Sequence, residues 1–139
     1  MASSLGVGRR EARERAVHLL YEAEQREVVV ADVLAAQVLP ADEYTAEVCA
    51  GVESERSEID AIIGSHATGW TVERMATMDR LVLEIATYEL RHRDDVPTAV
   101  VLNEAVELAN SYGSDESGGF VNGVLSAIAR ATRVDDPGE

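Results

Sequence analysis

Arginine is concentrated near the amino terminus of an otherwise acidic chain. Four of the twelve arginines fall within seven consecutive positions: Arg9, Arg10, Arg13 and Arg15. Guanidinium groups bind phosphate bidentately, and Tyr21 farther along the same predicted helix offers a flat ring for an unstacked base. A solvated helix start is the simpler alternative, although arginines there oppose the helix dipole at a small cost. The combination of arginines and a tyrosine is typical of a surface for single-stranded RNA.

A second polar segment, SDESGGF at residues 114–120, separates two apolar helical patterns. Its two glycines permit a close approach of another molecule, and the backbone N–H groups at the following helix start attract anions. Phe120 adds an aromatic ring, so the segment suits a phosphate or a turn of RNA. Asp115 and Glu116 oppose an anion there. Asn122, considered alone, is typical of a surface residue.

No pattern of catalytic or metal-binding residues is present in the sequence. Glu89 and His92 form one Glu-x-x-His pair. A di-metal helical bundle requires two such pairs and two further glutamates, so we expect a solvated helix end instead. Cys49 has no nucleophile signature around it and is expected to be a small core residue. We predict a protein that is not an enzyme and has no metal and no cofactor.

Length and charge narrow the class of protein further. The chain has 139 residues and a formal net charge of −14, which disfavours strong unaided binding to nucleic acid. We predict one domain over residues 1–139, with a loose arm at 1–7 and an acidic tail at 134–139. A single cysteine allows no internal disulfide. Without an apolar run of membrane length or a cleavable leader, we expect a cytoplasmic protein.

Hydrophobic periodicity predicts an all-α bundle of about seven helices and no strand. The expected helices begin near Arg9, at Val30, after Asp42, near Val72, near Met78, after Pro97 and near Ser117. The one after Asp42 is predicted to be a single long helix that reaches about Gly64. Gly113 suits a left-handed helix end, and the candidate caps of the last helix are Ser114, Asp115 and Ser117.

Three ordered blocks resemble the bacterial transcription antitermination factor family NusB. They are RREARERAVHLLYEAE, MDRLVLEIATYELRHRDDVP and DVPTAVVLNEAVELANSYGSDESGGFVNGVL, and together they span nearly the whole chain. The resemblance implies two packed three-helix groups. It also implies binding to the boxA segment of ribosomal RNA leader transcripts, together with the ribosomal small-subunit protein NusE, within RNA polymerase complexes that read through terminators.

The resemblance also assigns roles to individual residues. By position, the RNA-binding residues are Arg9, Arg10, Arg13, Tyr21, Ser117, Phe120 and Asn122. Glu73 and Asp79 are the candidate contacts to the basic partner, and solvated carboxylates at helix starts are an equally good reading of both.

Two other functions remain as alternatives to RNA binding with a partner. One is a module that self-associates as a homodimer and binds RNA weakly or not at all. The other is the RNA-binding appendage of an rRNA cytosine methyltransferase, which would need a fused catalytic domain that we do not expect here.

Overall fold

The computed structural model describes residues 7–133, which form seven α-helices, one 3-10 helix and no strand. Helices α1 (Val7–Arg26), α2 (Val30–Ala35) and α3 (Glu43–Ser54) make one group. Helices α4 (Arg56–His66), α5 (Thr77–His92), α6 (Thr98–Tyr112) and α7 (Ser117–Thr132) make the other. The short 3-10 helix η2 (Val72–Arg74) precedes α5. The all-α prediction is confirmed, whereas the predicted arm mostly and the acidic tail entirely lie outside the described residues.

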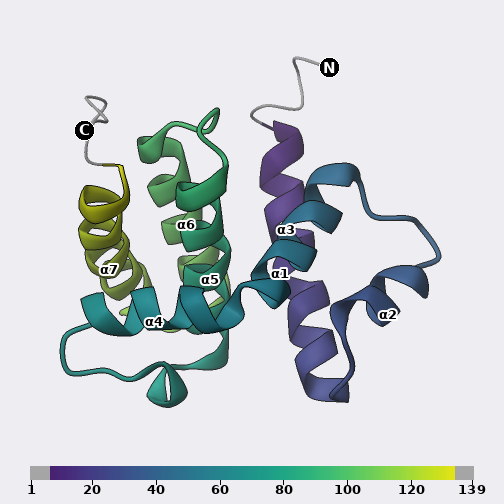
Figure 1. The fold of residues 1–139 in the computed structure, drawn as a ribbon, viewed down its shortest axis with the longest axis horizontal. Helices are drawn as coiled ribbons and strands as arrows, with labels where there is room; N and C mark the ends of the chain where they lie inside the picture. The colour runs from purple at the N-terminus through teal and green to yellow at the C-terminus, as the bar shows by residue number, and fades with distance from the viewer. Residues whose placement is uncertain (1–6, 134–139) are drawn as a thin grey trace.

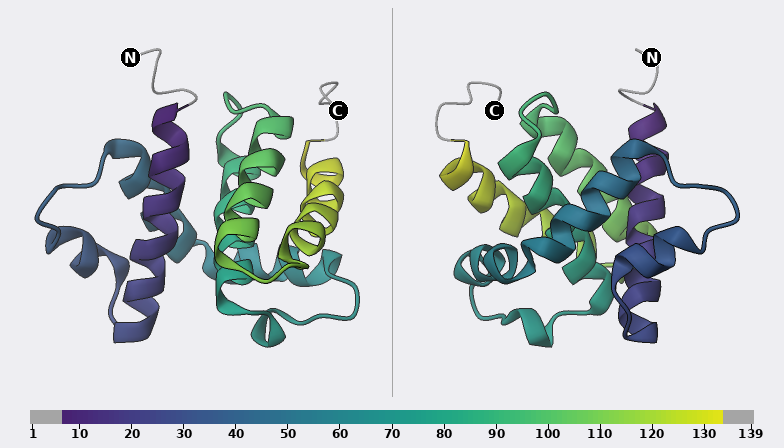
Figure 2. Two further views of the ribbon diagram at one scale, coloured as in Figure 1. Left: turned by 180° about the vertical axis from the view of Figure 1, so that it is seen from behind. Right: turned by 45° about the vertical axis from the view of Figure 1, so that its right-hand side comes forward.

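The two groups stand side by side, and α3 and α4 lead the chain from the first group to the second (Figures 1 and 2). Helix α5 joins them, because it packs against α1 and α3 on one side and against α6 and α7 on the other. All ten residues from 81 to 90 are buried, which is unusual for one helix and follows from this central position. The core is mainly aliphatic and includes Cys49, as predicted; burial raises the pKa of its thiol to about 12.

The prediction of one long helix from Asp42 to Gly64 is wrong. The chain breaks between α3 and α4 at Glu55, whose backbone has φ −110° and ψ 16°. The Glu55 carboxylate meets the end of α5, with Arg91 at 2.9 Å and His92 at 2.8 Å. Apolar spacing continues through the break, so the sequence pattern alone did not reveal it.

The predicted role of Gly113 is also wrong. Its φ of −110° and ψ of −159° are extended rather than left-handed. Glycine is needed for space instead, because a Cβ there would lie 2.3 Å from Ser117 Oγ and 2.8 Å from the Ala109 carbonyl oxygen. None of the three predicted caps is the N-cap of α7; that position is Glu116, without a capping side-chain bond.

Helix α7 is attached to α5 through Arg133. Its guanidinium donates to the carbonyl oxygens of Glu89 and Leu90 at 3.1 Å and of Arg93 at 2.9 Å. These bonds add to the backbone bonds at the end of α5, where the Glu89 carbonyl also accepts the N–H of Arg93 at 2.9 Å and the Arg93 carbonyl accepts that of Val96 at 3.0 Å. They hold the end of α7 against the end of α5.

Candidate nucleic-acid interface

The arginines of α1 all have partners within the chain. Arg9 pairs with Asp95 at 3.0 Å and lies over the ring of Tyr44, 4.5 Å from its centroid. Arg15 donates to the carbonyl oxygens of Leu39 and Pro40 and so holds the connection between α2 and α3. The predicted arginine surface is therefore largely neutralised in this structure, and what each arginine can do for RNA depends on its exposure.

Arg13 lies in the core, with only 3% of its side chain exposed. Its Nε donates to both carboxylate oxygens of Glu89 at 3.0 and 2.9 Å, and the Tyr44 hydroxyl donates to the same carboxylate. We call these three residues the buried junction. Burial, followed by the charge of Glu89, raises the pKa of Tyr44. We therefore regard Arg13 as an element that joins α1 to α5, and we leave it out of the RNA surface.

The buried junction also changes the interpretation of the Glu-x-x-His pair. The prediction that Glu89 lies at a solvated helix end is wrong. The side chain is buried against Arg13. His92 instead pairs with Glu55. Within residues 7–133, no group of three or more histidine, cysteine or carboxylate side chains is placed to hold a metal ion.

Arg10 occupies a different environment from Arg13, although only three residues separate them on α1. Its side chain is 59% exposed and makes a bidentate pair with Glu104 of α6, at 2.9 and 2.7 Å. We call this pair the groove rim. The hydrogen bond to Arg10 is the main reason that the pKa of Glu104 is lowered. An RNA phosphate that binds Arg10 must therefore share the guanidinium with Glu104 or displace it.

The groove rim borders a polar groove of about 630 Å³ between α6 and α7. Its polar side chains are Arg10, Asn103, Glu104, Glu107, Asn110 and Asn122. Gly118 and Gly119 complete it, and they leave the first turn of α7 without side chains on this side. The polar groove thus brings together Arg10 and Asn122, two predicted RNA-binding residues that are far apart in the sequence.

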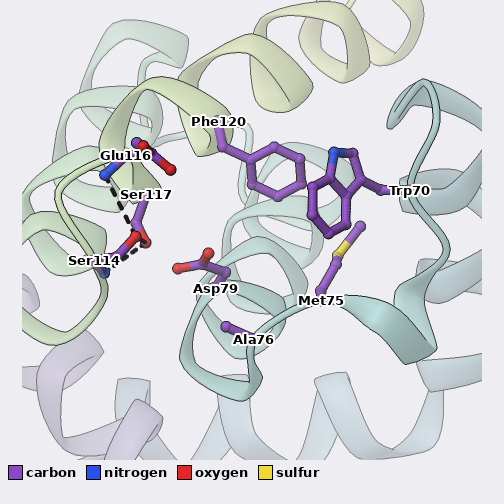
Figure 3. Close-up of a pocket in the computed structure, with 8 residues that line it drawn as sticks. All are labelled: Trp70, Met75, Ala76, Asp79, Ser114, Glu116, Ser117 and Phe120. Atoms are coloured by element: carbon purple, nitrogen blue, oxygen red, sulfur yellow. Dashed lines mark hydrogen bonds between the residues drawn. The ribbon is translucent and has the colours of Figure 1, made fainter.

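A second concave surface, the apolar pocket, lies on the other side of α7 (Figure 3). It has a volume of about 390 Å³ and is bordered by Trp70, Met75, Asp79, Glu116, Ser117 and Phe120 together with Ala76 and Ser114. Trp70 and Phe120 meet edge to face, with ring centroids 5.8 Å apart. The pocket combines Ser117 and Phe120, predicted to bind RNA, with Asp79, predicted to bind the partner.

The polar residues of the apolar pocket differ in how far their bonding capacity is used. Ser117 is buried, and its hydroxyl accepts the backbone N–H of Ser114 at 2.9 Å, so it holds the loop before α7. Asp79 Oδ1 is buried and has no hydrogen-bond partner among the described residues. A buried acceptor without a hydrogen-bond partner costs free energy, so a donor that reached it would be bound favourably. Glu73, the other predicted partner contact, is exposed on η2.

The predicted RNA-binding residues therefore do not form one continuous surface. Phe120 and Asn122 are two residues apart on α7, which places them about 200° apart around the helix axis. Each faces a different concavity. Tyr21 is 39% exposed on α1, but eleven residues separate it from Arg10, or roughly 16 Å along the helix. The sequence pattern did not indicate Trp70, Asn103, Glu104 or Asn110, although Asn103 and Asn110 have the spacing of one helix face.

Comparison with known proteins places the chain in a family. The model of the NusB family matches residues 10–130. The chain belongs to the NusB family. A NusB structure from T. maritima is 33% identical and covers 90% of this chain and 92% of its own, with a TM-score of 0.80. The NusB solution structure from Aquifex aeolicus is 28% identical and covers 94% of this chain and 93% of its own, with a TM-score of 0.75.

A further NusB relative is seen in a complex. The crystal structure of antitermination factors NusB and NusE in complex with dsRNA matches at 28% identity and a TM-score of 0.75, covering 88% of this chain and 96% of the other. In that complex, RNA and NusE accompany the relative of this chain. No helix within the described part of this chain is long and apolar enough to cross a membrane.

Proposed function

We propose that this protein is a cytoplasmic RNA-binding transcription antitermination factor that binds boxA-type RNA of ribosomal RNA leader transcripts together with NusE. Its membership of the NusB family supports this function most directly, along with the relative found in complex with NusE and RNA. The protein acts by assembly with RNA polymerase complexes rather than by catalysis.

The polar groove and its rim are the proposed RNA surface. Arg10 is the exposed cation of this surface, and Asn122 supplies an amide on the opposite wall. Arg9 lies nearby on α1, where its charge is shared with Asp95. Tyr21 would contact RNA that continues along α1. The intramolecular pairs limit the affinity of the isolated protein, because every phosphate competes with a carboxylate for the same guanidinium.

The apolar pocket is the proposed contact to NusE. Its exposed Trp70 gives a hydrophobic anchor, and Asp79, which lines the pocket, adds a negative charge for a basic partner. Glu73 adds a second negative charge near the start of α5. Phe120 then has a role in the partner contact in addition to, or instead of, RNA stacking. Asp79→Asn should weaken NusE binding by about tenfold in calorimetric titration, whereas Asp32→Asn on exposed α2 should not.

The RNA proposal is tested by titrating labelled boxA RNA with the protein, with and without NusE, over a range of salt concentrations. Arg10→Ala should lower the affinity and reduce the slope of log K against log salt by about one, since one phosphate contact is lost. Arg26→Ala is a matched control, because Arg26 is 55% exposed on the same helix and also pairs with a glutamate. Equal slopes for the three proteins would contradict the proposed RNA surface.

Self-association gives a different result in the same experiment. A module that dimerises and does not bind RNA would show no RNA titration, and its sedimentation coefficient would rise with protein concentration. The pairing of Arg9, Arg10 and Arg13 with carboxylates favours this alternative, because paired arginines attract phosphate less strongly.

A further inference from the structure

All three asparagines of this chain line the polar groove. Asn103 and Asn110 come from α6, and Asn122 comes from α7. They are separated by seven and twelve residues in sequence, and only the packing of α7 against α6 places them on one surface. Each side-chain amide offers one acceptor and two donors in a plane, which is the pattern that recognises the edge of a nucleobase.

The groove wall is built so that Asn110 lies close to the backbone of α7. A Cβ at Gly118 would be 2.3 Å from Asn110 Oδ1, so no other residue at 118 is compatible with this position of the amide. At Gly119 a Cβ would meet no atom within 4 Å, which leaves the space beside the amides open. The two glycines therefore have separate roles, one in packing and one in access.

The charge of the groove disfavours phosphate on its floor. Glu104 and Glu107 contribute two carboxylates, whereas Arg10 at the rim is the single cation among the residues that line the groove. Carboxylates repel phosphate but accept hydrogen bonds from the exocyclic amino groups of bases. A base edge is thus more compatible with the groove than the sugar-phosphate backbone, which would pass the rim near Arg10.

We propose that the polar groove holds an unstacked nucleobase that carries an amino group, read through the amides of Asn103, Asn110 and Asn122, and that these residues set the sequence preference of the protein. This inference rests on the proposed RNA-binding function. Adenine and cytosine present an amino donor beside a ring acceptor, which matches an amide, whereas the two carbonyl oxygens of uracil face repulsion from Glu104 and Glu107.

The test uses labelled oligoadenylate, oligocytidylate and oligouridylate of about 12 nucleotides, titrated by fluorescence anisotropy at low salt. The wild-type protein should bind one of the first two at least about fivefold more tightly than oligouridylate. The double variant Asn103→Ala and Asn110→Ala should reduce this preference to within about twofold, with an unchanged salt slope, because amides carry no charge. Gln25→Ala, which removes an exposed amide outside the groove, should change neither quantity.

A steric variant tests the same groove without removing an amide. Gly119→Leu should reduce binding of all three oligonucleotides, because the side chain would project into the open space of the groove. Gly123→Leu is its control, since Gly123 is also exposed on α7, does not line the groove, and has no atom within 4 Å of the position that a Cβ would take. Circular dichroism of both variants should show the helical content of the wild type, because leucine favours a helix more than the glycine it replaces.

Three results would overturn the inference. They are a wild-type protein without preference among the oligonucleotides, a double variant that keeps the preference, and a Gly119→Leu variant that binds like Gly123→Leu. If boxA RNA with NusE is bound but none of the three oligonucleotides is, the inference fails and the proposed function stands. If boxA RNA is not bound either, both fail.

Discussion

Two arginines of α1 each pair with a glutamate of a later helix, one in the core and the other at the surface. At the buried junction, Arg13 and Glu89 are 3% and 1% exposed, and Tyr44 completes the bonding of the carboxylate. At the groove rim, Arg10 is 59% exposed and Glu104 is 15% exposed. The same pair of residue types therefore holds the fold together at one position. Three residues earlier, it leaves a cation available to a ligand.

The two pairs differ because the free-energy cost of leaving a charge unpaired rises with its burial. Removing one member of a buried pair leaves the other without compensation in a medium of low dielectric constant. An exposed pair is replaced by water at little cost. The arginine cluster of the sequence is therefore a mixture of structural and functional residues, and stability and binding measurements should separate them.

The largest expected effect is on the buried junction. Arg13→Ala should lower the free energy of unfolding by about 3–5 kcal/mol, because Glu89 would remain buried without its partner. Arg10→Ala should leave the free energy of unfolding almost unchanged. Urea denaturation followed by circular dichroism measures both. Adding Glu89→Gln to Arg13→Ala should restore part of the loss, since the uncompensated charge is removed. Equal stability of the two single variants would contradict the assignment of Arg13 to the core.

A second buried carboxylate of α5 sharpens the comparison through its pH dependence. Glu84 is fully buried beside Arg56 and Arg80, and Arg80 also binds Glu24 of α1. Burial, then a hydrogen bond with Asp60, raises the pKa of Glu84 to about 8. The folded state thus holds a proton that the unfolded chain releases near pH 4.5. Its contribution to stability is complete below that pH and is lost as the pH rises through about 8.

The measurement is urea denaturation of wild type and Glu84→Gln at pH values on both sides of this window. The wild type should lose up to about 5 kcal/mol between the lower and the upper pH, and the variant should lose less. Glu58→Gln is the control, because Glu58 is 69% exposed on α4. A wild type that is equally stable throughout the window, or the same pH dependence in all three proteins, would show that Glu84 titrates as an ordinary carboxylate.

The smallest expected effect is at the groove rim. Glu104→Gln should tighten RNA binding by about two- to fivefold, because Arg10 no longer shares its charge with a carboxylate. The salt slope should become steeper by up to about one. Anisotropy titrations over a range of salt measure both, with Glu22→Gln, the partner of Arg26, as a matched control. A weaker or unchanged affinity would mean that Glu104 does not compete with phosphate.

The helical spacing of apolar residues predicted most of the fold. The apolar spacing of the first, central and last helices matches α1, α5 and α7, because each buries one face or, for α5, nearly all of its surface. The break at Glu55 was not predicted, since the apolar spacing continues through it, and the partners of the Glu55 carboxylate, Arg91 and His92, come from a distant segment. Gly113 was misjudged for a different reason: two of the atoms that exclude a Cβ there, Ser117 Oγ and the Ala109 carbonyl oxygen, lie only four residues away, and a third, Asp79 Oδ1, belongs to α5.

The sequence by itself determined the helical class, the family resemblance and the residue types available for binding RNA. Those properties follow from composition and from the spacing of residues that are close together along the chain. Tertiary structure alone decided which arginine is buried, that Phe120 and Asn122 face different concavities, and that Asn103, Asn110 and Asn122 line one groove. Burial and side-chain pairing between helices depend on how α1, α5, α6 and α7 pack, and spacing along the sequence does not specify that packing.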